Sequence, residues 1–287
     1  MPTTSAVLQE GRDRLRQSGS ETPALDAEVL LRHVLRIDRT ALFRLLTEHI
    51  DETTRAAYNR LLDERARGVP VAYLTGEREF MALPFQVAPG VLVPRPETEV
   101  LVEWAISWLA EREHATVVDV GAGSGAIALS LAANMNPNWS GRIIAADLSP
   151  AAIAITAANR ARLGLVNAVA LVQGSLIDWL AGPVDLLLAN LPYLRPDQID
   201  ANPALAAEPR LALDGGPDGL ALIRRLLMDA PRVLAPGGAI GLEIDPSQRD
   251  TVSTLAATAF PAATVAVLRD LAGLDRHVLM LVKDNQG

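Results

Sequence analysis

The 287-residue sequence contains no cysteine and little histidine. Without cysteine the chain forms no disulfide, offers no thiol nucleophile and binds no metal through sulfur. The histidines are scattered and show neither an HxxxH nor an HExxH spacing, so a histidine-based metal site is not expected. We therefore expect no metal site.

Long apolar runs and an excess of positive charge are also missing. No segment approaches the roughly 18 uninterrupted apolar residues that mark a candidate membrane span. Residues 1–5 show neither an apolar core nor an Arg-rich amphipathic pattern, so we expect no signal peptide, no membrane contact and a cytoplasmic location. The formal net charge of −8 argues against direct contact with nucleic acid. A protein that binds the phosphate backbone of a nucleic acid usually carries a basic patch.

What is present is an ordinary globular composition in a chain long enough for two domains. Apolar residues recur at helical spacing between residues 27 and 34, and Thr22-Pro23 predicts a helix start with a capping hydroxyl. Asp51 opens another predicted helix, which runs to Gly68. Residues 1–75 are thus expected to form a bundle of four or so helices. This part carries no catalytic constellation and is interpreted as a packing or substrate-docking domain.

Residues 76–96 differ in composition from the helical segment before them, because glycines and prolines interrupt short apolar stretches. The stretches around Phe80 and Phe85 predict a hairpin that links two domains. Pro96 then starts a helix that is expected to run to about Glu111. The third predicted domain therefore spans residues 97–287.

From residue 116 onward, strand and helix patterns alternate, which predicts an α/β fold with a parallel, doubly wound sheet. Strands are expected over residues 116–120, 142–146, 169–172, 184–189, 239–244, 263–268 and 277–282. Helices are expected over residues 126–134, 150–163, 220–234 and 246–259, with a turn at residues 236–238. The last two strands, joined through Gly273, are expected to form an antiparallel hairpin at one edge.

Ligands of such sheets bind at the carboxyl ends of the strands, where a glycine-rich loop follows the first predicted strand. Its glycines allow a tight turn and a close approach of ligand to backbone. Asp147 ends the next strand and is suited to accept hydrogen bonds from a ribose. A turn at residues 174–176 is placed to flank an adenine. The predicted cofactor-binding residues are Asp119, Gly121, Ala122, Gly123, Ser124, Gly125, Asp147, Ser175, Leu176 and Asn190.

The glycine loop alone does not identify the cofactor, because dinucleotide and S-adenosylmethionine folds both use one. The spacing here lacks the third glycine of GxGxxG, and Asp119 two residues before the first glycine suits a sulfonium ligand that carries an amine. The loop therefore favours S-adenosylmethionine over NAD, with a purely structural turn as a further alternative.

The sequence Asn190-Leu191-Pro192-Tyr193 follows the strand at 184–189 and lies beside the predicted nucleotide pocket. Alone, it is typical of a turn. At this position, the Asn190 side-chain oxygen and the Leu191 carbonyl are both able to accept hydrogen bonds from one NH2 group. Tyr193 is placed to pack on the flat face of that group. We predict catalytic and substrate-binding roles for Asn190, Leu191, Pro192 and Tyr193.

Together with the loops above, residues 73–80, 93–99, 208–216 and 269–273 make the chain resemble the release factor glutamine methyltransferases. This is the HemK/PrmC family of protein-(glutamine-N5) methyltransferases. The resemblance covers nearly the whole chain. It implies an N-terminal helical domain and a class I S-adenosylmethionine-dependent methyltransferase domain with a Rossmann-like seven-stranded sheet. It also implies methyl transfer to the glutamine in the Gly-Gly-Gln motif of peptide chain release factors.

Three positions depart from the family pattern. Leu191 replaces the first proline of Asn-Pro-Pro-Tyr but keeps the backbone carbonyl that the chemistry uses. Ser175 stands where an aspartate is usual. Asp245 follows its strand where the family more often has glycine or another residue, and nothing in the sequence explains it.

Two stretches, Arg78-Glu79-Phe80 and Glu208-Pro209-Arg210, are predicted to shape the substrate mouth of an enzyme that acts as a monomer. Phe80, Arg95 and Glu208 are predicted to bind substrate. For the arginines and acids of the two stretches, surface charge on a solvated loop is an equal alternative. One alternative function is an adenine-N6 nucleic-acid methyltransferase, which needs base flipping and a basic groove. Another is a non-catalytic module that binds release factors or ribosomes, but the intact glycine loop and Asn190 argue against it.

Overall fold

The computed structural model describes residues 1–283, which form two compact units. One unit comprises residues 1–77 and 202–207, and the other comprises residues 78–201 and those from 208 onward. Residues 78–96, expected as a linker, cluster with the second unit. None of the helices described is long and apolar enough to cross a membrane.

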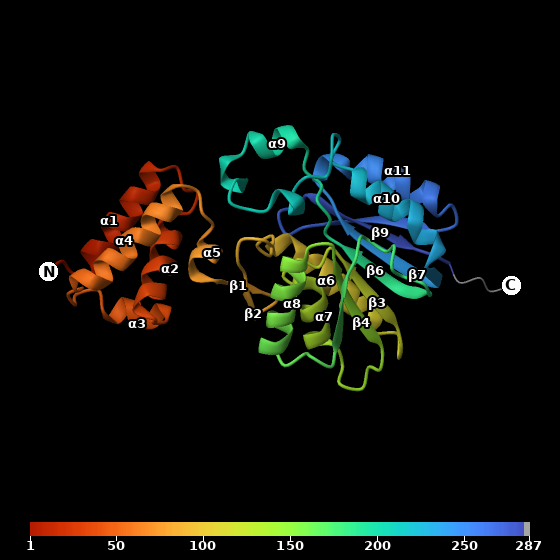
Figure 1. The fold of residues 1–287 in the computed structure, drawn as a ribbon, viewed down its shortest axis with the longest axis horizontal. Coiled ribbons are helices and arrows are strands. Elements are labelled where there is room, and N and C mark those ends of the chain that lie inside the picture. Colours follow the sequence, from red (N-terminus) through yellow and green to blue (C-terminus); the bar gives the residue numbers. More distant parts are fainter. Residues whose placement is uncertain (284–287) are drawn as a thin grey trace. The chain divides into compact units, whose positions relative to one another are not determined.

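The first unit consists mainly of five helices, one more than about four predicted (Figure 1). They are α1 Thr4–Gln17, α2 Pro23–Leu35, α3 Arg39–Arg44, α4 Glu52–Ala66 and α5 Val71–Thr75. Tyr58 of α4 is fully buried, and its hydroxyl donates to the Ala27 carbonyl at 3.0 Å. Pro23 begins α2 as predicted, but Thr22 does not cap it, because its hydroxyl donates to Asp26 at 2.9 Å instead.

The predicted hairpin is confirmed: strands β1 Glu77–Phe80 and β2 Leu83–Gln86 form a two-stranded sheet. Met81 and Ala82 connect them with φ values of 49° and 58°, which is the conformation of a tight hairpin turn. The Phe80 and Phe85 rings are buried and meet edge to face with their centroids 6.0 Å apart.

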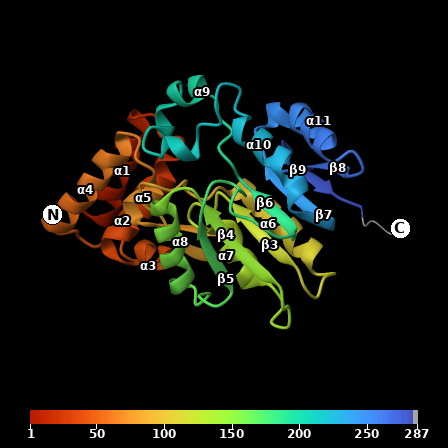
Figure 2. The same ribbon diagram turned by 45° about the vertical axis from the view of Figure 1, so that its right-hand side comes forward.

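The second unit is built on a seven-stranded sheet, which confirms the predicted α/β fold class (Figure 2). Its strands are β3 Thr116–Val120, β4 Arg142–Asp147, β5 Val169–Gln173, β6 Val184–Ala189, β7 Leu234–Glu243, β8 Thr264–Arg269 and β9 Asp275–Leu281. The order is β5-β4-β3-β6-β7-β9-β8, and the first five strands are parallel. Strand β9 pairs antiparallel with both β7 and β8, so the predicted edge hairpin is also confirmed.

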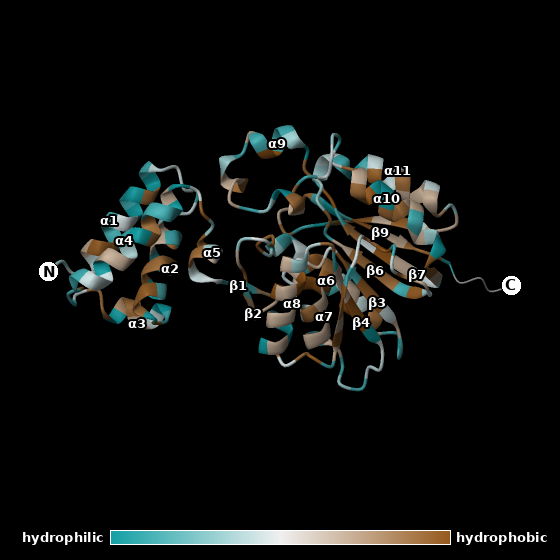
Figure 3. Cartoon of the chain, viewed as in Figure 1, coloured by the Kyte–Doolittle hydropathy of each residue, from teal (hydrophilic) through white to brown (hydrophobic). Residues whose placement is uncertain are grey.

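Helices cover both faces of this sheet, as its apolar strands require. Helices α6 Glu99–Leu109, α7 Ala126–Asn134 and α8 Pro150–Arg162 lie on one face, and α10 Ala221–Asp229 and α11 Arg249–Ala259 lie on the other (Figure 1). Successive residues of a strand face the helices on opposite sides of the sheet. Val117 packs into one apolar cluster and Val118 into the other. The central strands are accordingly mostly brown, the colour of hydrophobic residues (Figure 3).

Two local predictions are wrong. The turn expected at residues 236–238 lies inside β7, where Val184 pairs with Leu234 but Leu186 pairs with Ala239, so the extra residues form a bulge. Turn-forming residues suit a bulge as well as a turn. The helix expected over 220–234 ends at Asp229 and continues only as the 3₁₀ helix η4 Ala230–Arg232. The helix expected over 246–259 is confirmed, with the 3₁₀ helix η5 Pro246–Gln248 as its first turn before α11.

Candidate active site

The candidate site lies where the strand order reverses, because β3 pairs with β4 on one side and β6 on the other. Val120, the last residue of β3, is level with Ala146 of β4 and Ala189 of β6. The residues that follow these three positions are Gly121, Asp147 and Asn190. The fold therefore brings the glycine loop, the carboxylate and the amide to one edge, which is the usual ligand position in an open α/β sheet.

The glycine loop needs its glycines for conformation and for space. Gly121, Gly123 and Gly125 have φ values of 78°, 58° and 83°, in the left-handed region that disfavours other residues. A Cβ at Gly125 would lie 2.7 Å from the side chain of Thr156, whereas at Gly123 it would meet only the Gly121 carbonyl oxygen, at 4.0 Å. Gly123 thus faces open space that a side chain would fill.

Asp147 is held in place by the backbone around it. One carboxylate oxygen accepts from the Gly123 N–H at 2.9 Å and the other from the Ser149 N–H at 2.8 Å. Each oxygen keeps a further lone pair for another donor. The carboxylate is therefore fixed against the loop and still able to accept hydrogen bonds from a ligand.

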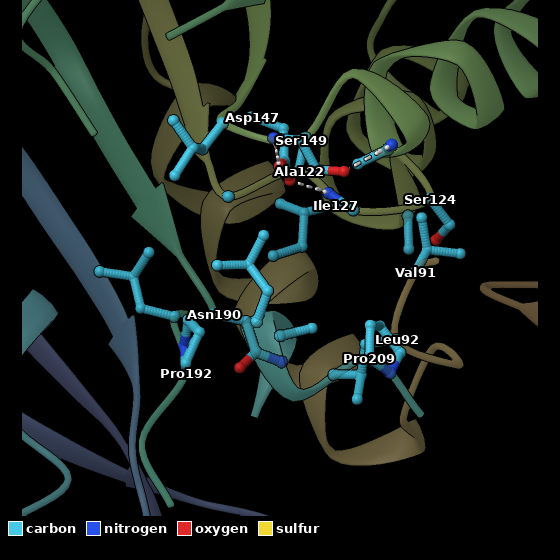
Figure 4. A pocket seen from close by; sticks show the side chains of 18 of the residues that line it. Val91, Leu92, Ala122, Ser124, Ile127, Asp147, Ser149, Asn190, Pro192 and Pro209 are labelled. Atoms are coloured by element: carbon cyan, nitrogen blue, oxygen red, sulfur yellow. Dashed lines mark hydrogen bonds between the residues drawn. The ribbon is translucent and has the colours of Figure 1, made fainter. Parts of the chain in front are cut away.

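A cavity of about 280 Å³ opens between these elements, near the lower end of the roughly 300–1,000 Å³ of small-molecule sites. Figure 4 shows Asp147 and Ser149 toward one end and Asn190 and Pro192 toward the other. The predicted site residues that line it are Phe80, Arg95, Gly121, Ala122, Gly123, Ser124, Asp147, Ser175, Leu176, Asn190, Leu191 and Pro192. The sequence-based prediction missed several further lining residues, among them Val91, Leu92, Thr98, Ile127, Ser149 and Leu222.

Four predicted site residues, Asp119, Gly125, Tyr193 and Glu208, are not among the described residues that line the cavity. Asp119 lies under the loop, where one of its oxygens accepts from the Ala128 N–H at 3.1 Å. Its other oxygen is buried and has no hydrogen-bond partner in the part of the chain that the structure describes. Burial raises the pKa of Asp119 to about 7, although the Ala128 N–H opposes the shift, and the negative charge of Asp147 adds to it.

Glu208 lies behind the cavity wall and contacts residues of the segments that form it. Its buried carboxylate accepts from the Val93 N–H at 3.1 Å and forms an ion pair with Arg95. It thereby ties two lining segments, 90–95 and 209–212, to each other. Of the predicted substrate-binding residues Arg95 and Glu208, the glutamate is thus buried and the arginine partly exposed, and the two are paired with each other.

The turn after β5 is shaped by its neighbours. Leu176 has a φ of 44°, and its carbonyl accepts from the Trp179 indole at 2.9 Å. Ser175, where the family usually has aspartate, accepts from Arg225 at 3.2 Å, and Arg225 also pairs with Asp178. The hydroxyl of Ser175 is thus engaged by a neighbouring cation.

The segment 190–193 is fixed at both ends. The Asn190 amide nitrogen donates to the Thr98 hydroxyl at 3.1 Å, and the Tyr193 hydroxyl donates to Glu243 at 3.4 Å. Burial raises the pKa of Tyr193 above its usual range, and the charge of Glu243 adds to this, so Tyr193 remains a neutral donor. Leu191, which follows Asn190, is buried. Its side chain lies 3.1 Å from the position that a Cβ on Gly121 would occupy.

Comparison with known proteins agrees with this architecture. A family model described as the PrmC N-terminal domain matches residues 6–76, and one described as a methyltransferase domain matches residues 111–261. The release factor glutamine methyltransferase of Moorella thermoacetica is 43% identical over 279 residues, covering 96% of this chain and 98% of the relative. The chain belongs to the release factor glutamine methyltransferase family.

Other relatives fit the same assignment. The release factor glutamine methyltransferase of Rhodopirellula baltica is 37% identical, covering 97% of this chain and 96% of the relative. Among solved structures, the T. thermophilus 16S rRNA N2 G1207 methyltransferase, in complex with AdoMet and guanosine, aligns with a TM-score of 0.51. That alignment covers 72% of this chain and 49% of the other at 18% identity, so it supports the methyltransferase fold alone.

Proposed function

We propose that this member of the family transfers a methyl group from S-adenosylmethionine to the N5 nitrogen of the glutamine in the Gly-Gly-Gln motif of peptide chain release factors. The observation that carries the proposal is the setting of Asn190. Its amide lies in the same cavity as the glycine loop and Asp147, and its nitrogen is already bonded to Thr98. Its oxygen therefore remains for a substrate NH2 group.

The residues of the cavity fit S-adenosylmethionine. The open side of Gly123 leaves room against the backbone, and Asp147 keeps lone pairs for the two ribose hydroxyls. Leu148, Leu176 and the other apolar lining residues suit the faces of an adenine. When bound, S-adenosylmethionine supplies a methyl carbon on a positively charged sulfur, which is an electrophile for nitrogen.

The task of the protein is then to orient the substrate amide. An amide nitrogen is a poor nucleophile because its lone pair is delocalised, so alignment of the reacting groups contributes much of the rate. The Asn190 oxygen and the Leu191 carbonyl accept from the two N–H bonds of the substrate NH2 group and fix its plane. The same oxygens stabilise the positive charge that develops on the nitrogen while its bond to the methyl carbon forms and the carbon–sulfur bond breaks. The products are S-adenosylhomocysteine and the methylated amide, whose nitrogen gives up one proton to water.

The helical unit is the proposed docking site for the release factor, because it carries its own core and no predicted catalytic group. Under this proposal the enzyme works as a monomer in the cytoplasm, where its substrate acts. Both statements stay predictions. Asp119 and Gly125, which lie behind the cavity wall, are proposed to support the cofactor indirectly by shaping the loop.

The test is methylation with labelled S-adenosylmethionine in parallel reactions containing a release factor or an oligonucleotide. We expect label on the glutamine of the release factor and none on the oligonucleotide. Asn190→Ala should lower the transfer rate by about a hundredfold or more, while cofactor affinity changes little. Label on nucleic acid alone, or an Asn190→Ala variant with the wild-type rate, would contradict the proposal.

A further inference from the structure

A buried polar network lies behind Asn190 and joins three elements that are distant in sequence. The Thr98 hydroxyl, at the end of the 3₁₀ helix η1 Pro96–Thr98, donates to Glu243 at 2.6 Å and accepts from the Asn190 amide at 3.1 Å. Glu243 ends β7, and its second oxygen accepts from the Tyr193 hydroxyl at 3.4 Å. One carboxylate thus holds both ends of the segment 190–193.

The chemistry of these groups permits only one direction of hydrogen bonding while Glu243 is ionised. A carboxylate only accepts, so the single Thr98 proton must point toward Glu243. The Thr98 oxygen then has only lone pairs left for Asn190, and the Asn190 atom that faces it must be the NH2 group. The Asn190 oxygen is consequently turned away from Thr98.

The network has features that a purely structural contact does not need. Glu243 is 1% exposed, and a buried carboxylate costs free energy unless hydrogen bonds satisfy it. Its further neighbour is the fully buried His277, whose ring nitrogen lies 3.7 Å from the carboxylate and has no hydrogen-bond partner among the residues described. Apolar residues of similar size would fill such a space at lower cost. What the charge adds is a fixed direction for the amide.

We propose that Thr98 and Glu243 are positioning residues that set the orientation of the Asn190 amide. Glu243 fixes the Thr98 proton, Thr98 fixes the Asn190 NH2 group, and the Asn190 oxygen is thereby presented to the substrate nitrogen. The negative charge of Glu243 also polarises the chain of hydrogen bonds and makes that oxygen a better acceptor. This inference rests on the proposed function and deepens it.

The test compares Thr98→Val, Thr98→Ser and Glu243→Gln with wild type. Valine keeps the shape of threonine and removes the relay, whereas serine keeps the hydroxyl. Glutamine keeps the shape of Glu243 but offers Thr98 either an oxygen or an NH2 group, so the amide direction is no longer specified. Ser130→Ala is the matched control, because Ser130 is fully buried in α7 and its hydroxyl has no partner among the described residues.

Three measurements are made on each full-length variant: kcat and KM with a release factor, the Kd for S-adenosylhomocysteine, and the thermal unfolding midpoint. We expect Thr98→Val to lower kcat about a hundredfold, with KM and the Kd close to wild type. Thr98→Ser should recover most of kcat, Glu243→Gln should fall between the two, and Ser130→Ala should keep the wild-type kcat.

The outcomes separate this inference from the function on which it rests. A wild-type protein that labels no release factor overturns both. A wild-type protein that labels the release factor, with a Thr98→Val variant of equal kcat, overturns the positioning role alone. The positioning role is also overturned if Thr98→Ser fails to restore kcat, or if every variant loses kcat only in proportion to its loss of folded protein.

Discussion

At the scale of single residues, the proposed site uses two hydrogen-bond acceptors from adjacent residues, and only one of them is a side chain. Leu191 contributes a backbone carbonyl, while its buried side chain packs in the apolar cluster on the α10 and α11 face. Carbonyl and side chain can therefore be varied separately. The departure from the family's proline at this position changes packing and leaves the acceptor in place.

Leu191→Pro should retain methyl transfer at close to the wild-type rate, because the carbonyl remains. Its unfolding midpoint should fall, since the proline ring fills less of the space that leucine occupies beside Gly121. Steady-state kinetics and thermal unfolding measure the two effects. A large loss of kcat in a variant that is still folded would show that the loop geometry depends on leucine.

Asp119 should make stability depend on pH. Its carboxyl ionises near pH 4 in the unfolded chain but at about pH 7 in the folded protein. Between these values the folded protein holds a proton that the unfolded chain has lost. The free energy of unfolding therefore falls as pH rises from about 4 to about 7, by on the order of 4 kcal/mol at most.

Asp119→Asn should remove this dependence and be the more stable protein at pH 8. Urea unfolding of both proteins at pH 5 and pH 8 measures the difference. Parallel pH profiles would show that Asp119 ionises normally.

The sequence predicted a site role for Asn190 but not the direction of its amide. That direction is set by Thr98, which is 92 residues away along the chain, and by Glu243 on a different strand. In the sequence, Thr98 lies at a predicted helix start within one of the stretches that carry the family resemblance, and Glu243 lies within an apolar strand. Neither position by itself indicates a role beside Asn190. A hydrogen-bond network of this kind exists only after the sheet is assembled.

At the scale of elements, the alternating pattern was enough to predict every strand of the sheet and the antiparallel edge. Burial on both faces makes these strands apolar runs, and such runs are strong signals. The details that failed are local, such as the bulge in β7, because its shape depends on continued pairing with β6. Part of the apolar cavity wall was also missed, since Leu92, Ile127 and Leu222 resemble core residues until the cavity is seen.

Glu208 should hold two segments of that wall together. In Glu208→Ala, the Val93 N–H and Arg95 lose their shared partner, so we expect a loss of about 1.5–3 kcal/mol in stability and a higher KM for the cofactor. Hydrogen exchange at the Val93 amide should quicken. Glu208→Gln is the control, because it keeps an acceptor for Val93, and equal exchange in both variants would contradict the tie.

At the scale of the whole molecule, the sequence separated a helical part from an α/β part because their apolar periods differ. It did not predict that residues 202–207 cluster with the helical unit, since more than a hundred residues lie between them and its last helix. The residues that line the cavity belong to the second unit. The proposed docking role of the first unit is therefore testable by loosening that unit and leaving the cavity residues unchanged.

Gly11→Ala is suited to this purpose. Gly11 is buried in α1, and a Cβ there would collide with the Tyr58 hydroxyl and lie 2.9 Å from the ring carbon that carries it. We expect a destabilised helical unit, a raised KM for a full-length release factor and an unchanged Kd for S-adenosylhomocysteine. Transfer to a short Gly-Gly-Gln peptide should be unaffected, because the peptide lacks the surfaces that dock.

The control is Gly11→Ala combined with Tyr58→Phe, which removes the hydroxyl that causes the closest contact. Phenylalanine also loses the hydrogen bond to the Ala27 carbonyl, worth about 1 kcal/mol, so recovery should be partial. A double-mutant cycle on stability and on the release-factor KM should give coupling of the same sign in both. Coupling in stability without any change in KM would show that the helical unit does not dock the substrate.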